Sequence, residues 1–333
     1  MTNSKSNIQG LDLLRGLCGY VVAICHYQWL VNQINYFEYI SILFVEFFFI
    51  LSGFVLAPQL IKIINEKKYI FVFFQRRWMR TIPLYLLSLF VVSIITNNIF
   101  NKDFFLYFFF LNKSLPNLIE NDYFAVAWSL AVEEYFYLFF PFLIYFFFNK
   151  KNFIKNSINL FIILSIFLIL MSFFVDNNFY RTGTFLRIDS ILCGFLLAVL
   201  SIEKKIKIQY IIIFLIFLLS LYYYYYKFEL HSLDLFYNKI LFLNLIKIIA
   251  IFILLFFYNI NLGKHFTHIF KLLANQTYSI YLLHLPLIYI INSSDMLNFN
   301  LVQYCILLFI ISTIVFYFFE KPILSLRPKY EKN

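Results

Sequence analysis

The stretch LDLLRGLCGYVVAICHYQWLV, residues 11–31, carries Arg15 and His26 within an otherwise largely apolar segment. Its length is enough for a helix that crosses the hydrocarbon core of a bilayer. Arg15 and His26 are eleven positions apart, which at about 100° and 1.5 Å per residue is almost three turns. The two side chains therefore share one face of the expected helix, roughly 16 Å apart along its axis. Because a charge in hydrocarbon costs about 3 to 10 kcal/mol or more, such residues indicate a function or a buried partner.

The composition excludes a soluble globular protein. Of the 333 residues, 62% are hydrophobic, 23% are aromatic and only 13% are charged, whereas about half of a soluble domain is apolar. We therefore predict an all-α, polytopic membrane helix bundle with about ten transmembrane helices. The expected spans are approximately residues 11–31, 38–58, 80–97, 125–148, 157–175, 186–201, 208–226, 240–258, 272–292 and 301–319.

The loop charges predict the orientation. With a cytoplasmic N-terminus, nineteen of the 27 Lys and Arg residues fall on the inner side and five on the outer side, while Arg15, Arg187 and Lys247 lie in or beside helices. Both termini are then cytoplasmic, and the protein is a multi-pass component of the cell (inner or cytoplasmic) membrane. Because the basic residues are spread over several short loops, the net charge of +10 gives no reason to expect a nucleic-acid partner.

We expect residues 1–333 to form one transmembrane domain, with no fused extracytoplasmic domain. A cleavable signal peptide is not expected, because Arg15 interrupts the first apolar run. The four cysteines lie inside expected spans without CxxC spacing, which favours small buried side chains over disulfides or a metal site. They are Cys18, Cys25, Cys193 and Cys305.

The polar residues within the expected spans are sorted by depth. Arginines lie on the inner side, whereas carboxylates and imidazoles lie in the outer half or at the midplane. Guanidinium groups at a cytoplasmic mouth suit a phosphorylated donor, and histidine beside a carboxylate suits general base catalysis. These residue types alone leave group transfer and a proton-coupled carrier equally open. The inner set is Arg15, Arg76, Arg77 and Arg80, and the outer set is His26, Glu46, Glu133, Glu134, Asp189 and His284.

Seven strings occur in an order and spacing that resemble the acyltransferase-3 family of membrane O-acyltransferases, over residues 11–322. The resemblance implies transfer of an acyl group, most often acetyl, from acyl-CoA to an extracytoplasmic carbohydrate such as lipopolysaccharide, peptidoglycan or exopolysaccharide, without a metal. The strings are LDLLRGLCGYVVAICHY, FVEFFFILSGFVLA, RRWMRTIPLY, AWSLAVEEYFYLFFP, RIDSILCGFLLA, ANQTYSIYLLHLPL and FFEKP.

The resemblance also assigns roles to single residues. Arg15 and His26 match the family's essential arginine–histidine signature, and Arg77 and Arg80 match its arginine pair after the second span. Trp128, Ser129 and Glu133 match its tryptophan-serine-leucine-x-x-glutamate string, while Asp189 and His284 occupy positions that are often polar. Many relatives have Gly-Val-Asp where this chain has residues 44–46. Here Glu46 keeps the acidic group, but Phe44 replaces the glycine.

Simpler structural roles compete with several of these assignments. Arg15 has Asp12 three residues earlier as a possible ion-pair partner, and Arg76, Arg77 and Arg80 also suit ordinary positive-inside anchors. Ser129 has no nucleophile elbow around it, which favours a structural hydroxyl bonded to the backbone or to Glu133. Glu133 and Glu134 point about 100° apart, so only one of them faces a given cavity well.

The sequence thus predicts a transmembrane acyl path. We expect the nucleotide end of acetyl-CoA or another acyl-CoA to bind Arg76, Arg77 and Arg80, and its thioester to reach His26, which acts as general base or acyl carrier. Glu133 is expected to orient His26 or to hold the sugar. The acceptor is acylated directly or through a separate extracytoplasmic transferase. The alternative is a polytopic exporter or proton-coupled carrier for a glycan precursor.

Overall fold

The computed structural model describes residues 6–201, 208–227, 236–260, 266–293 and 299–330. Throughout these residues the chain forms helices joined by turns and contains no strand, which confirms the predicted all-α fold. The elements are α1 (Ser6–Leu30), α2 (Tyr36–Asn65), α3 (Tyr69–Ile95), α4 (Lys102–Phe108), α5 (Ala127–Phe147), α6 (Phe153–Met171), α7 (Asn177–Thr182), the 3-10 turn η1 (Thr184–Leu186), α8 (Ile188–Ser201), α9 (Ile208–Lys227), α10 (Phe236–Asn259), α11 (Thr267–Ser293), α12 (Leu301–Val315), the π-helical η3 (Phe316–Glu320) and α13 (Lys321–Ser325).

Each of the ten expected spans falls largely on a helix, but only six helices in the described part of the chain are long and apolar enough to cross a membrane. These six are α2, α3, α5, α6, α10 and the continuous run of α12, η3 and α13. Among the other four, α8 has 14 residues, about 21 Å, and is shorter than the hydrocarbon core. The count of ten spans and the orientation of the termini stay predictions. Six basic residues that enter the charge count lie outside the described residues: Lys5, Lys204, Lys205, Lys207, Lys264 and Lys332.

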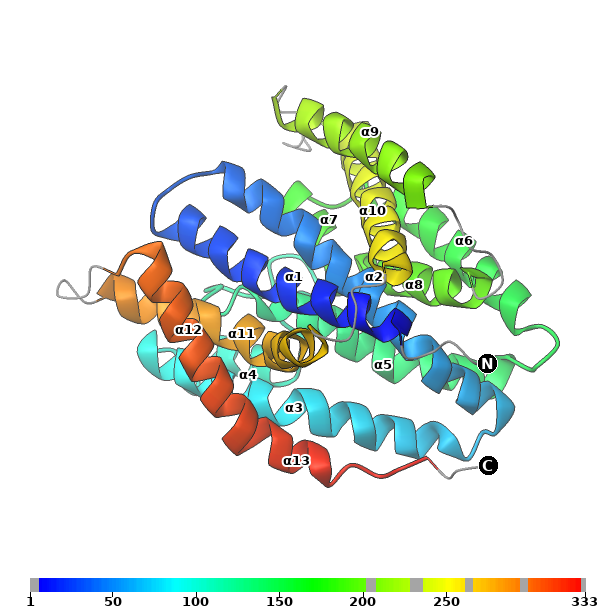
Figure 1. The fold of residues 1–333 in the computed structure, drawn as a ribbon, viewed down its shortest axis with the longest axis horizontal. Coiled ribbons are helices and arrows are strands. Elements are labelled where there is room, and N and C mark those ends of the chain that lie inside the picture. Colours follow the sequence, from blue (N-terminus) through cyan, green and yellow to red (C-terminus); the bar gives the residue numbers. More distant parts are fainter. Residues whose placement is uncertain (1–5, 202–207, 228–235, 261–265, 294–298, 331–333) are drawn as a thin grey trace.

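The centre of the bundle is α1, which packs against both α2 and α11. Figure 1 shows α1 crossing the middle of the molecule, with α9 and α10 along one edge and α3, α12 and α13 along the opposite edge. Small residues allow the close approach of α1 and α11, since a Cβ on Gly16 would lie 2.6 Å from the side chain of Leu273. The α1 face that carries Arg15 and His26 lines internal cavities between the helices.

A second close contact joins α2 and α8 through two glycines. A Cβ on Gly53 would lie 1.8 Å from the carbonyl oxygen of Ile191, and one on Gly194 would lie 1.9 Å from that of Ile50. Only residues without a side chain fit at such backbone contacts. Gly53 lies inside the unbroken α2 and marks this contact.

The outer helices expose apolar side chains. In α6 only Ser157 and Leu168 are buried, while isoleucines such as Ile163 and Ile166 point outward. A helix that is apolar on all sides and exposed in this way is suited to lipid. This exposure is consistent with a multi-pass membrane protein.

Short elements cover one end of the bundle. The stretch after Asn101 contains the seven-residue helix α4. The segment after α4 contacts the start of η1, where the Thr184 amide donates to the Lys113 carbonyl oxygen at 2.9 Å. Together, α4, residues 109–126 and α7 form a polar layer beside the ends of α1 and α2.

Candidate functional site

Two cavities lie at opposite ends of the α1 face that carries Arg15 and His26. The first, the arginine cavity, has a volume of about 330 Å³ and is lined by the first half of α1, the second half of α2 and the first half of α3. The second, the histidine cavity, has a volume of about 380 Å³ and is lined by the second half of α1, the first half of α2 and the polar layer. Arg15 belongs to the first cavity and His26 to the second.

The arginine cavity carries a large excess of positive charge. Five arginines line it, together with one carboxylate, that of Glu133, and within the described residues none of the five forms an ion pair. The Nε atoms of Arg76 and Arg77 are buried without a hydrogen-bond partner. Unpaired guanidinium donors of this kind suit a multiply charged anion such as a phosphate. The five are Arg15, Arg76, Arg77, Arg80 and Arg327.

Arg327 enters this cavity from the C-terminal tail, after the last helix. Burial, and then the nearby charges of Arg80, Arg76 and Arg77, lower the pKa of Arg327 from its usual 12.5 to about 10. The tail is held in place because Arg76 Nη1 donates to the Pro328 carbonyl oxygen at 2.6 Å. An anion bound here would relieve the repulsion among the arginines.

Glu133 belongs to the arginine cavity, where it forms part of a hydrogen-bonded chain. The Tyr137 hydroxyl donates to the Glu133 carboxylate at 2.6 Å, and the Ser52 hydroxyl lies 2.9 Å from the same tyrosine oxygen. Glu134 is buried but lines neither cavity. Glu133 is therefore far better placed to act on a ligand of the arginines than on His26.

His26 contacts His284 and not Glu133. His26 Nδ1 lies 2.8 Å from His284 Nε2, and the rings stack with centroids 5.0 Å apart. On its other side, His284 Nδ1 lies 3.2 Å from the Ile280 carbonyl oxygen, which can only accept a hydrogen bond. In the neutral pair, His284 Nδ1 therefore carries a proton and its Nε2 accepts one from His26 Nδ1. This leaves His26 Nε2 unprotonated, in a residue that lines the histidine cavity.

The histidine cavity is polar but electrically balanced. Each of its three cations pairs with a carboxylate of the same cavity: Arg187 with Glu46, Arg181 with Glu38 at 3.3 Å, and Lys113 with Asp122 at 2.7 Å. Trp29 and Trp128 add two aromatic faces to the wall. Balanced charge with aromatic surface suits an uncharged, hydroxyl-rich ligand.

A thin layer separates the two cavities. Val45 and Tyr281 line both of them, one from α2 and one from α11. The Ser129 hydroxyl donates to the Val126 carbonyl oxygen at 3.1 Å and lies 2.5 Å from the Tyr281 hydroxyl. Since each hydroxyl has one hydrogen, Ser129 then accepts from Tyr281, whose oxygen lies 3.3 Å from the same carbonyl. The Ser129 hydroxyl thus bonds to the backbone and to Tyr281, so that it holds the dividing wall.

Two further predicted residues form buried ion pairs, whereas the ion pair considered for Arg15 is not formed. Glu46 and Arg187 form an ion pair whose side chains are 2% and 3% exposed, at the wall of the histidine cavity. Asp189 pairs instead with Lys247 between α8 and α10, outside both cavities. Arg15 forms no ion pair with Asp12 within the described residues.

Several cavity residues were not predicted from the sequence. Arg327 was counted only as an inner-side charge, and Tyr281 was not singled out although it lies three residues before His284 on the same helix. A search for aromatic and basic residues one turn from each motif residue would have found Tyr281 and Tyr137. No such spacing identifies Arg327, because its place in the arginine cavity depends on how the C-terminal tail folds back toward α3.

The fold and its two cavities define a multi-pass helical membrane protein with an arginine-rich cavity at one end and a charge-balanced cavity at the other. A family model described as an acyltransferase domain matches residues 8–320, so the chain belongs to the acyltransferase-3 family. The comparisons with curated proteins and with solved structures return no match. Within the described residues there is no group of three or more His, Cys, Asp or Glu side chains able to hold a metal ion.

Proposed function

We propose that the protein is an integral membrane O-acyltransferase that moves an acyl group, acetyl in our preferred form, from cytosolic acyl-CoA to a hydroxyl of an extracytoplasmic glycan. The observation that carries the proposal is the pair of cavities, one lined by five arginines and one with balanced charge, that meet at Tyr281 and Val45. One side-chain layer between two binding spaces suits a reaction whose substrates approach from opposite faces of a membrane.

The arginine cavity would hold the donor. Coenzyme A carries several phosphate charges, and the excess of unpaired guanidinium groups complements them. Arg76, Arg77 and Arg80 would bind these phosphates, with Arg327 from the tail. The distribution of loop charges supports a cytoplasmic position for this end, at the inner or cytoplasmic membrane of the cell.

The histidine cavity would hold the acceptor sugar. Its paired charges favour an uncharged group, and Trp29 and Trp128 offer aromatic faces on which a sugar ring packs. These features fit a hydroxyl of a lipopolysaccharide, peptidoglycan or exopolysaccharide unit. In the simpler route the protein acylates the glycan directly. In the alternative route it passes the acyl group to a separate extracytoplasmic transferase, which acylates the glycan.

His26 Nε2 would accept the proton in the transfer step. The acceptor hydroxyl oxygen bonds to the thioester carbonyl carbon as the carbon–sulfur bond breaks, and Nε2 takes the hydroxyl proton. Nε2 then returns this proton to the CoA thiolate, so the products are an ester and free CoA. In a two-step route the same nitrogen would first attack the thioester carbon as the carbon–sulfur bond breaks, which gives CoA thiolate and an acyl-imidazolium that keeps its Nδ1 proton. The acceptor hydroxyl would then displace the imidazole, and its proton would pass to the CoA thiolate. His284 supports both routes by keeping the Nδ1 proton in place.

The donor's reactive end has to pass the wall between the cavities. Arg15 lines the donor side of that wall and would steady the thioester oxygen or the pantetheine arm. The wall opens if the Tyr281 side chain leaves Ser129, because Tyr281 lines both spaces. Glu133 and Tyr137 would hold the arm's amide groups from the donor side.

The test is acyl transfer by purified protein in vesicles supplied with radiolabelled acetyl-CoA. We expect CoA release in the wild-type protein and its loss in His26→Ala. Undiminished CoA release in His26→Ala would remove this residue from the mechanism. A protein that moves an unacylated glycan and releases no CoA would instead support a carrier.

A further inference from the structure

A third cavity lies in the polar layer, next to the histidine cavity. Its volume is about 230 Å³, and it is lined by residues 112–122 and by α7 with its cap. Lys113, Asp122, Asn178 and Thr182 line both this cavity and the histidine cavity, so the two cavities are direct neighbours. We call it the loop cavity.

Asn112 is the feature that points to a ligand. It lines the loop cavity and is only 1% exposed, yet neither its Oδ1 nor its Nδ2 has a hydrogen-bond partner in the described part of the chain. Leaving such groups unpaired costs about 1–3 kcal/mol each. A single water has a share of about 30 Å³, so the cavity is far larger than the space needed to satisfy one amide with water. An amide offers one acceptor and two donors, which match adjacent sugar hydroxyls.

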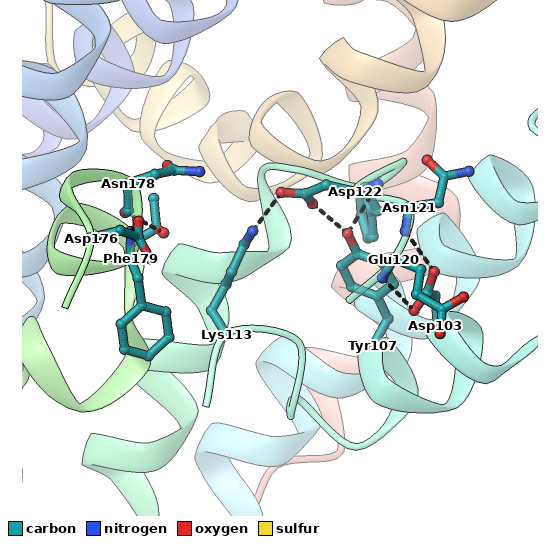
Figure 2. Close-up of polar contacts among 11 residues, drawn as sticks. Asp103, Tyr107, Lys113, Glu120, Asn121, Asp122, Asp176, Asn178 and Phe179 are labelled. Carbon is teal, nitrogen blue, oxygen red and sulfur yellow. Dashed lines mark hydrogen bonds and ion pairs between the residues drawn. The ribbon is translucent and has the colours of Figure 1, made fainter. Parts of the chain in front are cut away.

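The segment that carries Asp122 is held in position by hydrogen bonds and an ion pair. Figure 2 shows Lys113 reaching Asp122, whose Oδ1 also accepts from the Tyr107 hydroxyl at 2.5 Å. In the same view, the Asp103 carboxylate accepts from the backbone amides of Glu120 and Asn121, at 3.2 and 2.8 Å. These bonds fix the segment that carries Asp122 before any ligand binds.

The other wall is equally fixed. Asp176 caps α7, since its Oδ1 accepts from the Phe179 amide at 2.8 Å, and Figure 2 places Asn178 beside Lys113 on this side. The Phe179 ring also lines the cavity. Lys113, Asp122 and Asp176 together give no positive excess, which disfavours a phosphate, and the Lys113 ammonium disfavours a metal ion. Amides, carboxylates and an aromatic ring without positive excess suit an uncharged sugar.

We propose that the loop cavity is a second saccharide subsite, which binds the sugar unit next to the one that enters the histidine cavity. The acceptor is then an oligosaccharide or polysaccharide of at least two units, and a free monosaccharide is a poor acceptor. This inference rests on the proposed binding of a glycan in the histidine cavity. It adds a minimum length for the acceptor and names the residues that bind its second sugar unit.

Asn112→Leu is the informative variant. Leucine has a shape similar to asparagine and removes both unpaired polar atoms, a change that is neutral or stabilising for a buried group without partners. The matched control is Asn156→Leu on α6, whose amide donates to the Phe147 carbonyl oxygen and which lines none of the three cavities.

The assay is saturation-transfer NMR on the full chain in nanodiscs, with uncharged glucose, mannose, galactose, rhamnose and N-acetylglucosamine oligomers of one to four units. In at least one series we expect the dimer to bind about tenfold more tightly than the monomer, the effect of one or two neutral hydrogen bonds. Asn112→Leu should remove this gain and leave monomer binding unchanged, while Asn156→Leu keeps the gain.

Three results would overturn the subsite: no binding in any series, affinity independent of length, or a length effect that survives in Asn112→Leu. Displacement of the dimer by Ca²⁺ would also overturn it in favour of a cation site. The proposed function fails separately. The protein could show length-dependent binding that Asn112→Leu abolishes and yet transfer no acyl group from acyl-CoA. That result would support the saccharide subsite and refute the proposed acyltransferase activity.

Discussion

Replacing His284 by alanine tests the proton arrangement at the centre of the site. The substitution removes the acceptor of the His26 Nδ1 hydrogen bond, which is 2.8 Å long. As His26 takes the acceptor's proton its ring becomes cationic, and a hydrogen bond from a charged group contributes about 1.5–3 kcal/mol. Since each 1.36 kcal/mol is a factor of ten in rate, we expect kcat to fall about 10- to 150-fold.

The loss should be smaller than that in His26→Ala, where removal of the base costs about 10²- to 10⁴-fold. His284→Gln retains a side-chain acceptor and should recover part of the rate. The control is His268→Ala, an exposed histidine on the same helix. Rates are measured as CoA release at saturating acyl-CoA. A kcat in His284→Ala equal to that of the wild-type protein would refute the assignment of the Nδ1 proton.

Two further predictions concern the cavity walls. Arg327→Gln should raise the KM for acyl-CoA about 10- to 150-fold through loss of a charge-assisted hydrogen bond and leave the KM for the acceptor unchanged. The control is Lys329→Gln, at an exposed residue of the same tail. An unchanged KM for acyl-CoA in Arg327→Gln would exclude this residue from the donor site. Glu46→Gln should lower the free energy of unfolding by about 3–5 kcal/mol, because it leaves buried Arg187 without its counter-ion. Denaturation in mixed micelles measures this loss, and a Glu46→Gln, Arg187→Gln double variant that is less stable than the single variant would argue against the pair.

The helices and the polar face of α1 could be predicted because both follow from local patterns. Apolar runs of membrane-spanning length mark the helices, and an eleven-residue spacing places Arg15 and His26 on one face whatever the surroundings. The separation of the two residues into different cavities is consistent with the predicted division between arginines and imidazole. The same sorting places Glu133 with His26, whereas Glu133 lines the arginine cavity.

The partners across helices could not be predicted, because spacing along one helix says nothing of which neighbour faces it. Glu133 lies in the same cavity as Arg77 and Arg80, whereas its expected partner His26 contacts His284 on α11. Burial of Arg327 depends on the tail returning to α3, where Pro328 meets Arg76. The unpaired state of Asn112 likewise appears only once the loop is folded.

The most direct test of the account uses oriented proteoliposomes with acyl-CoA and glycan acceptor on opposite sides of the membrane. We predict transfer of the labelled acyl group when acyl-CoA is supplied on the side of the arginine cavity and the acceptor on the side of the histidine cavity. The reverse arrangement and His26→Ala should give none. Equal transfer from either side, or transfer by His26→Ala at the wild-type rate, would contradict an acyl path that runs from the arginine cavity to His26.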